Sequence, residues 1–328
     1  MTTDLRNDPG FREAARIAVQ DCLAVKAGET VLVVTDAPLY DIGRLLWEAS
    51  KAQGADAQLI EIMPREVHGE EPPAPVAAAM KAAQVVFCPT SKSLSHTEAR
   101  RQASAAGARI ATLPNILPET FRRAVAADYA AIARRSAEVA GWLTNCKQVH
   151  LTTPAGTDLT FSLEGREGDP DTGMCHQPGQ FSNLPAGEAY AAPLEGTANG
   201  VAVIDGTMLE TRLTEDPVRL VFRDGVVVEY SGHPDVVAKL KAIVAKHGTP
   251  ALVLAELGIG TNEKAELCGN TLEDEKILGT VHLAIGDNTG FGGKNRVASH
   301  QDGILLRPTL ILDGKKVMED GRLFVKEA

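Results

Sequence analysis

The sequence has few aromatic residues and no cluster of basic residues. Aromatic residues make up 4% of the 328 positions, which argues against a protein that stacks single-stranded nucleic acid on aromatic rings. Lys and Arg never run longer than a pair, and the formal net charge is −10. A surface that follows a phosphate backbone is therefore not expected, and we predict no nucleic-acid partner.

Paired cysteines and long apolar segments are also absent from the sequence. The five cysteines are Cys22, Cys88, Cys146, Cys175 and Cys268. Their odd number, wide spacing and lack of a Cys-x-x-Cys motif favour a reducing compartment, with most of them buried as small apolar side chains. The N-terminus has no apolar signal core, and no segment approaches the length of a membrane span. We therefore expect a cytoplasmic protein without a membrane partner.

The first 146 residues alternate between short apolar runs and helical patterns. The apolar runs are Thr30–Val34, Ala57–Met63, Gln84–Cys88 and Ala108–Leu113. The predicted helices include Phe11–Ala27, Tyr40–Gln53 and one long helix over Phe121–Thr144. Strands separated by helices predict parallel crossover connections and a doubly wound sheet. We predict an α/β, Rossmann-like domain over residues 1–146.

The pattern changes after residue 146, where short runs are broken by Gly, Pro and Asp. The predicted strands include Gln148–Thr152, Asp158–Leu163, Gly200–Ile204, Val218–Phe222 and Val226–Tyr230. Arg223–Gly225 and Leu312–Gly314 are typical of hairpin turns, and Asp235–His247 predicts a helix that ends at Gly248. We predict that residues 147–328 form an α+β, mainly antiparallel domain that binds metal and carries the catalytic site.

Two glutamates of the second half stand next to apolar runs. Glu188 follows a Pro-Ala-Gly turn, and Glu256 follows the apolar run Leu252–Ala255. We interpret the glycine-rich segment Leu257–Gly260 as a turn that begins directly after Glu256. A carboxylate at the end of a buried strand is costly to desolvate unless a cation or hydrogen-bond donors pair with it.

Two histidines of the same half lie in comparable positions. His282 is flanked by Val281 and Leu283 in an apolar run, and His300 is followed two residues later by Asp302. Side chains two apart on an extended segment point to the same side, so His300 and Asp302 can converge on one point. Imidazole and carboxylate groups together are a common metal-ligand set.

Each of these residues also has a structural interpretation. Glu188 could accept N–H groups of its own turn, Glu256 could pair with Lys264, and a lone histidine such as His282 is usually a hydrogen-bonded core residue. The three carboxylates and two imidazoles together favour a centre for one or two divalent cations, with carboxylates bridging them.

Several segments resemble, in their order, the thermophilic metalloaminopeptidases of the aminopeptidase T and S type. They are Asn183–Glu188, Ala255–Gly258, Leu272–Lys276, His282–Gly286 and Asn295–Asp302. Gly156–Thr160 also resembles the strand that opens the second domain in that family. The resemblance covers residues 148–322 and is looser in the first domain.

The resemblance implies a metal-dependent hydrolase that cleaves an amide or peptide bond of a small substrate. Its metal ligands would be Glu188, Glu256, His282, His300 and Asp302, which would bind one or two Zn, Mn or Co ions. Activated water would attack the carbonyl group, and Glu256 would manage the proton. The family has a tyrosine seven residues after the first histidine, where this chain has Thr289, which we expect at the substrate. The resemblance also implies a homodimer.

A more distant resemblance is to the non-haem iron 2,5-dihydroxypyridine dioxygenases. The chain shares their Gly286, Gly292-Gly293 and His-x-Asp pattern. Those enzymes have a histidine where this chain has Glu256, and a serine ligand where it has Ala284. The alternative function is therefore a mononuclear iron dioxygenase that opens a dihydroxypyridine-like ring, with His282, His300 and Asp302 as the facial ligand set.

Two further residues are candidates for substrate binding. His96 follows the predicted strand Gln84–Cys88, at the carboxyl end of a parallel sheet, where ligands usually bind. Helix capping by Ser95 or Thr97 is the structural alternative for this segment. Arg296 could bind a substrate carboxylate, although a solvated loop arginine is the usual case. A non-catalytic protein that binds metal or a small molecule is the third functional hypothesis.

Overall fold

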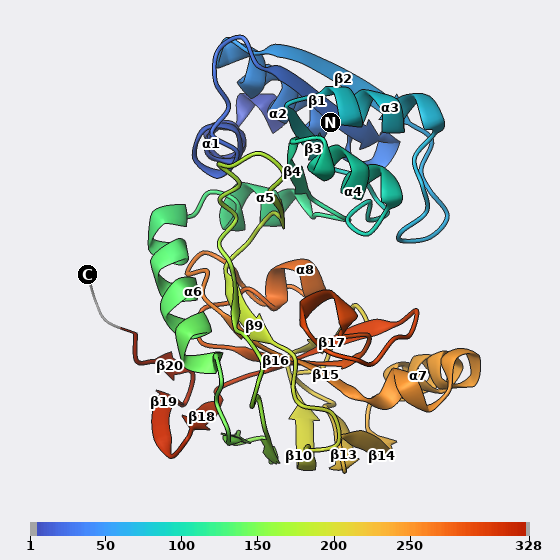
Figure 1. Cartoon of the computed structure of the whole chain (residues 1–328), viewed down its shortest axis with the longest axis vertical. Coiled ribbons are helices and arrows are strands. Elements are labelled where there is room, and N and C mark those ends of the chain that lie inside the picture. Colours follow the sequence, from blue (N-terminus) through green and yellow to red (C-terminus); the bar gives the residue numbers. More distant parts are fainter. Residues whose placement is uncertain (1–4, 326–328) are drawn as a thin grey trace. The chain divides into compact units, whose positions relative to one another are not determined.

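The computed structural model describes residues 5–325, which divide into two compact units (Figure 1). Unit 1 holds the residues up to Ala130 together with Thr172–Ala186, and unit 2 holds Ala131–Asp171 together with the residues from Gly187 onward. These units do not coincide with the ranges 1–146 and 147–328. Most of the N-terminal segment considered for a signal core (residues 1–4) lies outside the described residues. No helix in the described part of the chain is long and apolar enough to span a membrane.

Unit 1 is built on a parallel sheet of five strands in the order β2-β1-β3-β4-β8. The strands are β1 Thr30–Asp36, β2 Asp56–Ile62, β3 Val85–Cys88, β4 Arg109–Thr112 and β8 Phe181–Asn183. β3 and β4 are buried along their whole length, as expected for a sheet with helices on both faces. The predicted doubly wound parallel sheet is confirmed.

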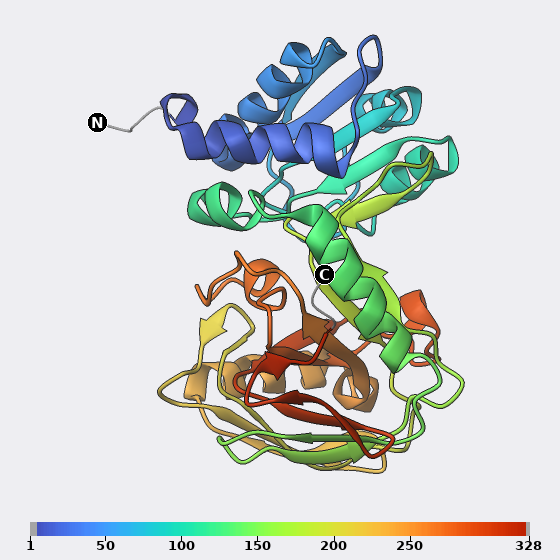
Figure 2. The same cartoon turned by 90° about the vertical axis from the view of Figure 1, so that its left-hand side faces the viewer.

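Helices cover the two faces of this sheet. They are α1 Pro9–Ile17, α2 Tyr40–Ala52, α3 Ala74–Ala82, α4 Glu98–Ala105 and α5 Pro118–Ala124. Helix α1, dark blue in Figure 2, packs against α2 and α5, whereas α3 packs against α4. Leu32 and Val34 of β1 share an apolar cluster with Met80 of α3 and Ala103 of α4. Alternate residues of β1 therefore pack on the layer of α3 and α4, and the residues between them face the other side of the sheet.

The helices differ from the sequence predictions in two places. The segment predicted as one helix over Phe121–Thr144 forms two, α5 and α6 Tyr129–Leu143. Asp128, a residue type that favours helix starts, directly precedes α6. The first predicted helix continues from α1 into a π-helical turn, Ala18–Cys22, and ends there rather than at Ala27.

Unit 2 contains two antiparallel sheets. The sheet of eight strands has the order β14-β13-β10-β6-β5-β18-β19-β20, and the sheet of seven has the order β12-β11-β17-β16-β15-β9-β7. The first sheet contains β5 Val149–Thr152, β6 Asp158–Phe161, β10 Asn199–Ile204, β13 Val218–Arg223, β14 Val226–Ser231, β18 Thr309–Leu312, β19 Lys315–Glu319 and β20 Arg322–Leu323. The second, here called the site sheet, contains β7 Asp169–Asp171, β9 Glu188–Ala191, β11 Thr207–Met208, β12 Thr211–Arg212, β15 Leu254–Gly260, β16 Val281–Gly286 and β17 His300–Leu305. The predicted antiparallel α+β segment is confirmed.

One apolar core joins the two sheets of unit 2. Leu151 and Leu220 of the first sheet share this core with Leu257, Leu283 and Leu305 of the site sheet. Helix α7 Pro234–His247 packs against β14, and the short helix α8 Thr271–Asp274 contacts β11 and β17. Because one face of the site sheet packs against the core, the polar residues that alternate with the core residues lie on its opposite face.

Candidate metal centre

The acidic and imidazole side chains lie on the face of the site sheet opposite the core. On β15 and β16, Leu257 and Leu283 belong to the core, so Glu256 and His282 point to the other face. The strand register places Glu256 beside Ala284 and Ala284 beside Asp302. Residues from three neighbouring strands therefore meet in one row across the sheet.

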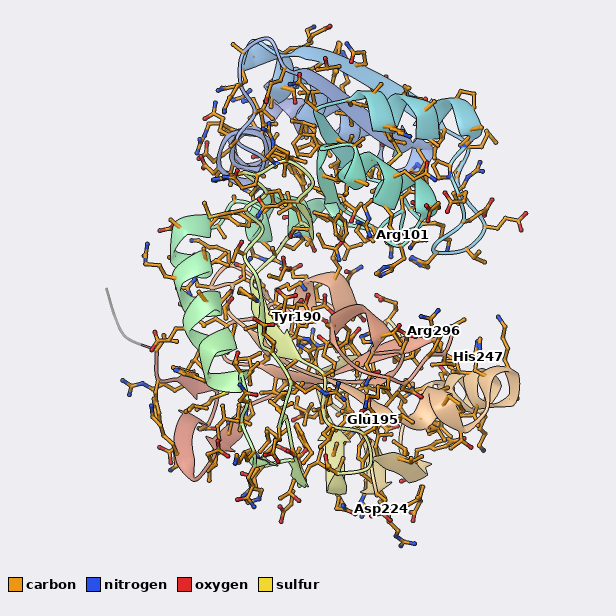
Figure 3. All side chains as sticks on the ribbon, viewed as in Figure 1. Arg101, Tyr190, Glu195, Asp224, His247 and Arg296 are labelled. Atoms are coloured by element: carbon orange, nitrogen blue, oxygen red, sulfur yellow. The ribbon has the colours of Figure 1, made fainter. Side chains whose placement is uncertain are left out.

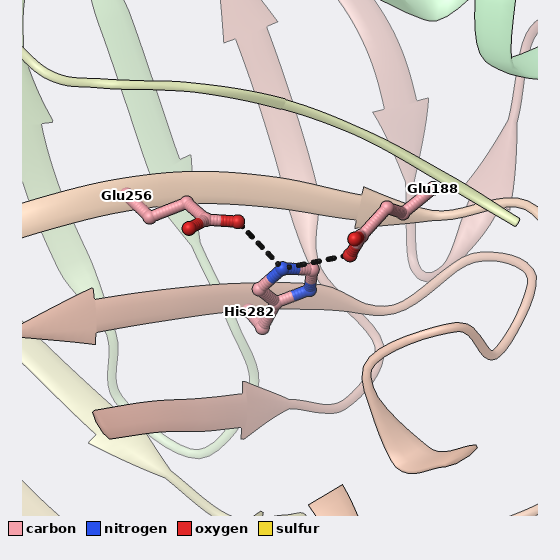
Figure 4. A group of neighbouring side chains, drawn as sticks. All are labelled: Glu188, Glu256 and His282. Carbon is pink, nitrogen blue, oxygen red and sulfur yellow. Dashed lines mark hydrogen bonds and ion pairs between the residues drawn. The ribbon is translucent and has the colours of Figure 1, made fainter. Parts of the chain in front are cut away.

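His282 lies between Glu188 and Glu256 (Figure 4). Its Nε2 atom is 3.1 Å from Glu188 Oε2 and 3.3 Å from Glu256 Oε1, and all three residues are buried. One imidazole nitrogen can donate only one hydrogen bond, and Glu188 Oε2 is left without a hydrogen-bond partner. A cation can accept lone pairs from all three atoms, so the residues of this group fit a metal ion.

Gly258 makes room for the imidazole ring of His282. Gly258 pairs with His282 across β15 and β16, and a Cβ atom added to it would lie 1.9 Å from Nε2 of His282. The ring therefore occupies the space that a side chain would fill. The interpretation of Leu257–Gly260 as a turn is wrong, because this segment continues β15 to Gly260.

A second group of possible ligands shares Glu256. Nε2 of His300 is 3.2 Å from Glu256 Oε2 and 3.4 Å from Asp302 Oδ1. Nδ1 of His300 donates to the carbonyl oxygen of Asp287 at 2.7 Å, which in the neutral ring leaves the lone pair on Nε2, toward the two carboxylates. Glu256 thus presents one oxygen to each group.

The two groups of three are Glu188, Glu256 and His282, here called the inner group, and Glu256, His300 and Asp302, here called the outer group. Within each group the ligand atoms lie within 4.8 Å of one another. The inner group is buried, whereas the side chain of His300 is 32% exposed. The outer group can therefore exchange water and bind solutes more readily.

Opposite charges hold the carboxylates in their ionised form. Burial alone would raise the pKa of Glu188, but the nearby charges of Lys276 and His282 lower it below its usual range. Burial would likewise lower the pKa of His282, but Glu188 and Glu256 raise it well above its usual value. The imidazolium charge compensates the carboxylates in the ion-free protein, and a cation can take over this role.

The loop between β16 and β17 carries the predicted substrate residues Thr289 and Arg296. The backbone N–H and hydroxyl of Thr289 donate to Asp287 Oδ1, at 3.1 and 2.9 Å, so Thr289 hydrogen-bonds within its own loop. Arg296, labelled in Figure 3, is exposed on the same loop. Neither residue belongs to the two groups of possible ligands.

Aromatic rings lie beside the outer group. Tyr190, labelled in Figure 3, is on β9, and its hydroxyl donates to Asp169 at 3.2 Å. Its ring lies edge-on to that of Phe291, with centroids 5.4 Å apart, and Phe291 lies edge-on to His300 at 6.1 Å. The loop that carries Thr289 thus also places an apolar surface next to His300.

His96 belongs to unit 1, whereas the candidate ligands Glu188, Glu256, His282, His300 and Asp302 belong to unit 2. Its side chain is exposed, and its carbonyl oxygen accepts a hydrogen bond from Arg101 at 2.7 Å. Thr97 caps α4, because its side-chain oxygen accepts from the N–H of Arg100. The capping interpretation of this segment is therefore confirmed for Thr97.

Sequence reasoning missed the role of Lys276 at this centre. Its ammonium is buried and lies 2.5 Å from Glu188 Oε1, whereas the sequence presents Lys276 only as the end of the segment Leu272–Lys276. A lysine that ends an acidic segment usually indicates a solvated surface. No local pattern reveals that the chain folds it onto a strand 88 residues away.

The fold and this site define a two-unit α/β protein with a carboxylate-rich candidate metal centre. The model of the family described as 2,5-dihydroxypyridine 5,6-dioxygenase matches residues 13–325. The chain belongs to this family. A curated relative, the 2,5-dihydroxypyridine 5,6-dioxygenase of Pseudomonas putida KT2440, is 23% identical over 198 residues. That match covers 56% of this chain and 56% of the relative.

Two solved structures share the fold. The 2,5-dihydroxypyridine dioxygenase of Pseudomonas putida KT2440 has a TM-score of 0.80 at 19% identity, with 97% of each chain covered. Wild-type AmpT from Thermus thermophilus has a TM-score of 0.71 at 19% identity, with 96% of this chain and 99% of that chain covered. The resemblance to the dioxygenases is confirmed as family membership, and the resemblance to the aminopeptidases is confirmed for the fold.

Proposed function

We propose that the protein is a metal-dependent hydrolase that cleaves an amide or peptide bond of a small substrate. The observation that carries this proposal is the position of Glu256, whose Oε1 faces the inner group and whose Oε2 faces the outer group. A carboxylate with one oxygen for each of two adjacent cation positions is typical of two-metal hydrolytic centres. Zn, Mn or Co would be suitable cations for these nitrogen and oxygen ligands.

Divalent cations, when bound, would lower the pKa of a water molecule and polarise the substrate carbonyl oxygen. His300 and Asp302 hold the solvent-accessible side of the centre, where His300 is fixed by its hydrogen bond to Asp287. If a cation filled the outer group alone, Oε1 of Glu256, which contacts His282 in the ion-free protein, would not be needed as a ligand of a second cation. We therefore assign the transfer of the proton to Glu256 in that state.

The contacts of the substrate are a further part of the proposal. Arg296 is exposed on the loop after β16 and would bind a substrate carboxylate. His96 and Thr289 are proposed as additional substrate contacts.

We also propose that the protein is a cytoplasmic homodimer that acts on a small-molecule or peptide substrate. Light scattering of the purified protein measures the oligomeric state.

Ring-cleaving dioxygenation is the second candidate function, because the family model and the curated relative carry that name. It requires two histidines and one carboxylate around one iron ion. Among the described residues, each group of three possible ligands contains only one histidine. The residue set His282, His300 and Asp302 is not one of these groups, which favours hydrolysis.

Metal analysis and two activity assays test the proposal. The ion-free protein is loaded with Zn, Mn or Co and assayed on aminoacyl p-nitroanilides, and in parallel it is loaded with Fe(II) and assayed for oxygen uptake on 2,5-dihydroxypyridine. We expect release of nitroaniline and loss of this activity in His300→Ala. The control is His150→Ala, which removes a histidine–aspartate pair (His150 and Asp158, 2.8 Å) outside the site.

The outcomes separate the three hypotheses. One iron per chain with oxygen uptake on the dihydroxypyridine would overturn the hydrolase proposal in favour of the dioxygenase. If His300→Ala abolishes metal binding but changes no measured turnover, the protein is a non-catalytic metal-binding protein.

A further inference from the structure

Lys276 is a buried cation at the edge of the candidate metal centre. Its ammonium lies 2.5 Å from Glu188 Oε1, 2.8 Å from Glu275 Oε1 and 3.7 Å from Asp171 Oδ2. The side chain is only 2% exposed. Its backbone is also held in place, because the N–H of Asn262 donates to the carbonyl oxygen of Lys276 at 2.8 Å. The ammonium is therefore a fixed charge beside one ligand position.

The lysine acts on only one of the two groups of ligands. Glu188, its closest contact, belongs to the inner group and not to the outer group. One oxygen of Glu188 is taken by Lys276, so only Oε2 remains for a cation. A cation between Glu188, Glu256 and His282 would also experience repulsion from the ammonium, which is weakly screened in a buried site.

The outer group has the opposite properties. Asp302 and Glu256 supply two carboxylates, and Nε2 of His300 faces both of them. Its histidine is partly exposed, so a cation can enter while it keeps some of its water. A cation that binds there also draws on Glu256 and lowers the negative charge left for the inner group.

We propose that Lys276 is a positioning residue that makes the two cation positions unequal, so that the outer group fills first and the inner group binds a second cation weakly. The lysine holds Glu188 with one oxygen turned away from the inner position. It also balances the buried carboxylates when that position is empty. This inference rests on the metal centre of the proposed function, but not on the reaction that the centre catalyses.

Titration of the ion-free protein with Co²⁺ tests the proposal, by calorimetry and by visible absorption. The wild type is expected to show two steps whose dissociation constants differ by about tenfold or more. In Lys276→Met the weaker step is expected to tighten by about tenfold, whereas the first step changes little. Lys276→Arg keeps the charge and is expected to keep the two steps unequal. Lys316→Met, at an exposed lysine paired with Glu319, is the matched control.

A second variant covers the case in which Lys276→Met does not fold, which circular dichroism would reveal. Glu188→Gln removes an inner ligand while its amide oxygen can still accept from Lys276, and it is expected to abolish only the weaker step. Two equal steps in the wild type, or loss of the tighter step in Glu188→Gln, would overturn the proposal. An unchanged titration of a folded Lys276→Met would overturn it as well. Absence of any cation binding to the wild type would instead contradict the metal centre itself.

Discussion

The substitution Gly258→Ala tests whether the position of His282 determines metal binding. The added Cβ would lie 1.9 Å from Nε2 and 2.1 Å from Cε1 of His282. Nonbonded carbon and nitrogen atoms prefer a separation of about 3.5 Å, so the ring must move by about 1.5 Å. His282 is 1% exposed and lies between two buried glutamates. The ring therefore cannot move without losing its contacts with Glu188 and Glu256.

This displacement is large compared with the tolerance of a metal site. Ligand distances must hold to about 0.2 Å, so a cation of the inner group would lose His282 as a ligand. We expect the dissociation constant of this cation to rise by about 100-fold or more. Even groups that only hydrogen-bond to the ligands change metal affinity by about 10- to 100-fold. Overpacking costs about 1–3 kcal/mol, partly offset by the lower backbone entropy of alanine in the unfolded chain. The midpoint of thermal unfolding should fall by several degrees.

Calorimetric titration with Co²⁺ and thermal unfolding followed by circular dichroism measure the two effects. Gly141→Ala is the matched control, because nothing lies within 4 Å of the added Cβ and alanine is favoured in a helix such as α6 by about 0.5–1 kcal/mol. The control should bind Co²⁺ like the wild type and unfold at the same or a higher temperature. If Gly258→Ala binds two cations per chain with the affinity of the wild type, the reasoning is refuted.

Three further predictions concern ions, acid and thiols. Removal of cations by a chelator should lower the midpoint of thermal unfolding, because a ligand at 100 times its dissociation constant stabilises the folded protein by about 2.7 kcal/mol. Scanning fluorimetry with and without added Zn²⁺ measures this shift. An unchanged midpoint would contradict the metal centre. Burial raises the pKa of Glu29, but the hydrogen bonds from Arg109 and from the backbone N–H of Lys26, together with the charges of these two residues, outweigh it and lower that pKa below the usual 4.5. The ionised Glu29 therefore stabilises the fold above pH 4.5, and this contribution is lost as the pH falls through the lower pKa of the folded state. Urea unfolding between pH 6 and 3 should show that the free energy of unfolding falls less steeply with acid in Glu29→Gln than in the wild type. An equal slope in both proteins would contradict the prediction. Cys268 is the exposed cysteine, but partial burial of its thiol and the charge of Asp274 raise its pKa to about 12. Iodoacetamide at pH 7.5 should therefore label Cys268 slowly, and the other four cysteines only after denaturation. Rapid labelling of the native protein would contradict this prediction.

The candidate ligands could be found from the sequence because a strand has a simple period. His300 and Asp302 were expected on one side of an extended segment, and β17 places them there. His282 and Glu256 stood out because they interrupt apolar runs, where a charge requires a partner. These inferences need only local information, since alternation and apolar context are properties of neighbouring residues.

The contacts between these residues depend on strand register, which the sequence does not reveal. Glu256, Ala284 and Asp302 form one row because β15, β16 and β17 pair in a particular alignment, and a shift by one residue would turn Glu256 into the core. The role of Gly258 was missed for the same reason. A glycine is compatible with a turn or with close packing across a strand, and the neighbouring His282 decides between them.

The segment from Thr172 to Ala186 shows a second limit of sequence reasoning. The sequence pattern predicts it within the second domain (147–328), but it adds β8 to the parallel sheet of unit 1 before the chain returns to unit 2 at Gly187. Such an excursion has little local signal, because β8 has only three residues. Its pairing with β4 is a long-range contact that composition and periodicity do not predict.

The family of this chain is named for a dioxygenase, whereas its candidate ligand set supports the hydrolase proposal. The residues around Ala284 show how one family can include both ligand sets. The dioxygenase pattern has a histidine at the position of Glu256 and a serine ligand at that of Ala284. In this chain Ala284 lies between Glu256 and Asp302 in the row across the site sheet, and its methyl group supplies no ligand. Glu256 adds a charge and two oxygens that reach both histidines. A chain that shares its fold with these relatives can therefore differ from them in the groups that it offers to a cation, so its function must be argued from the site rather than from the fold.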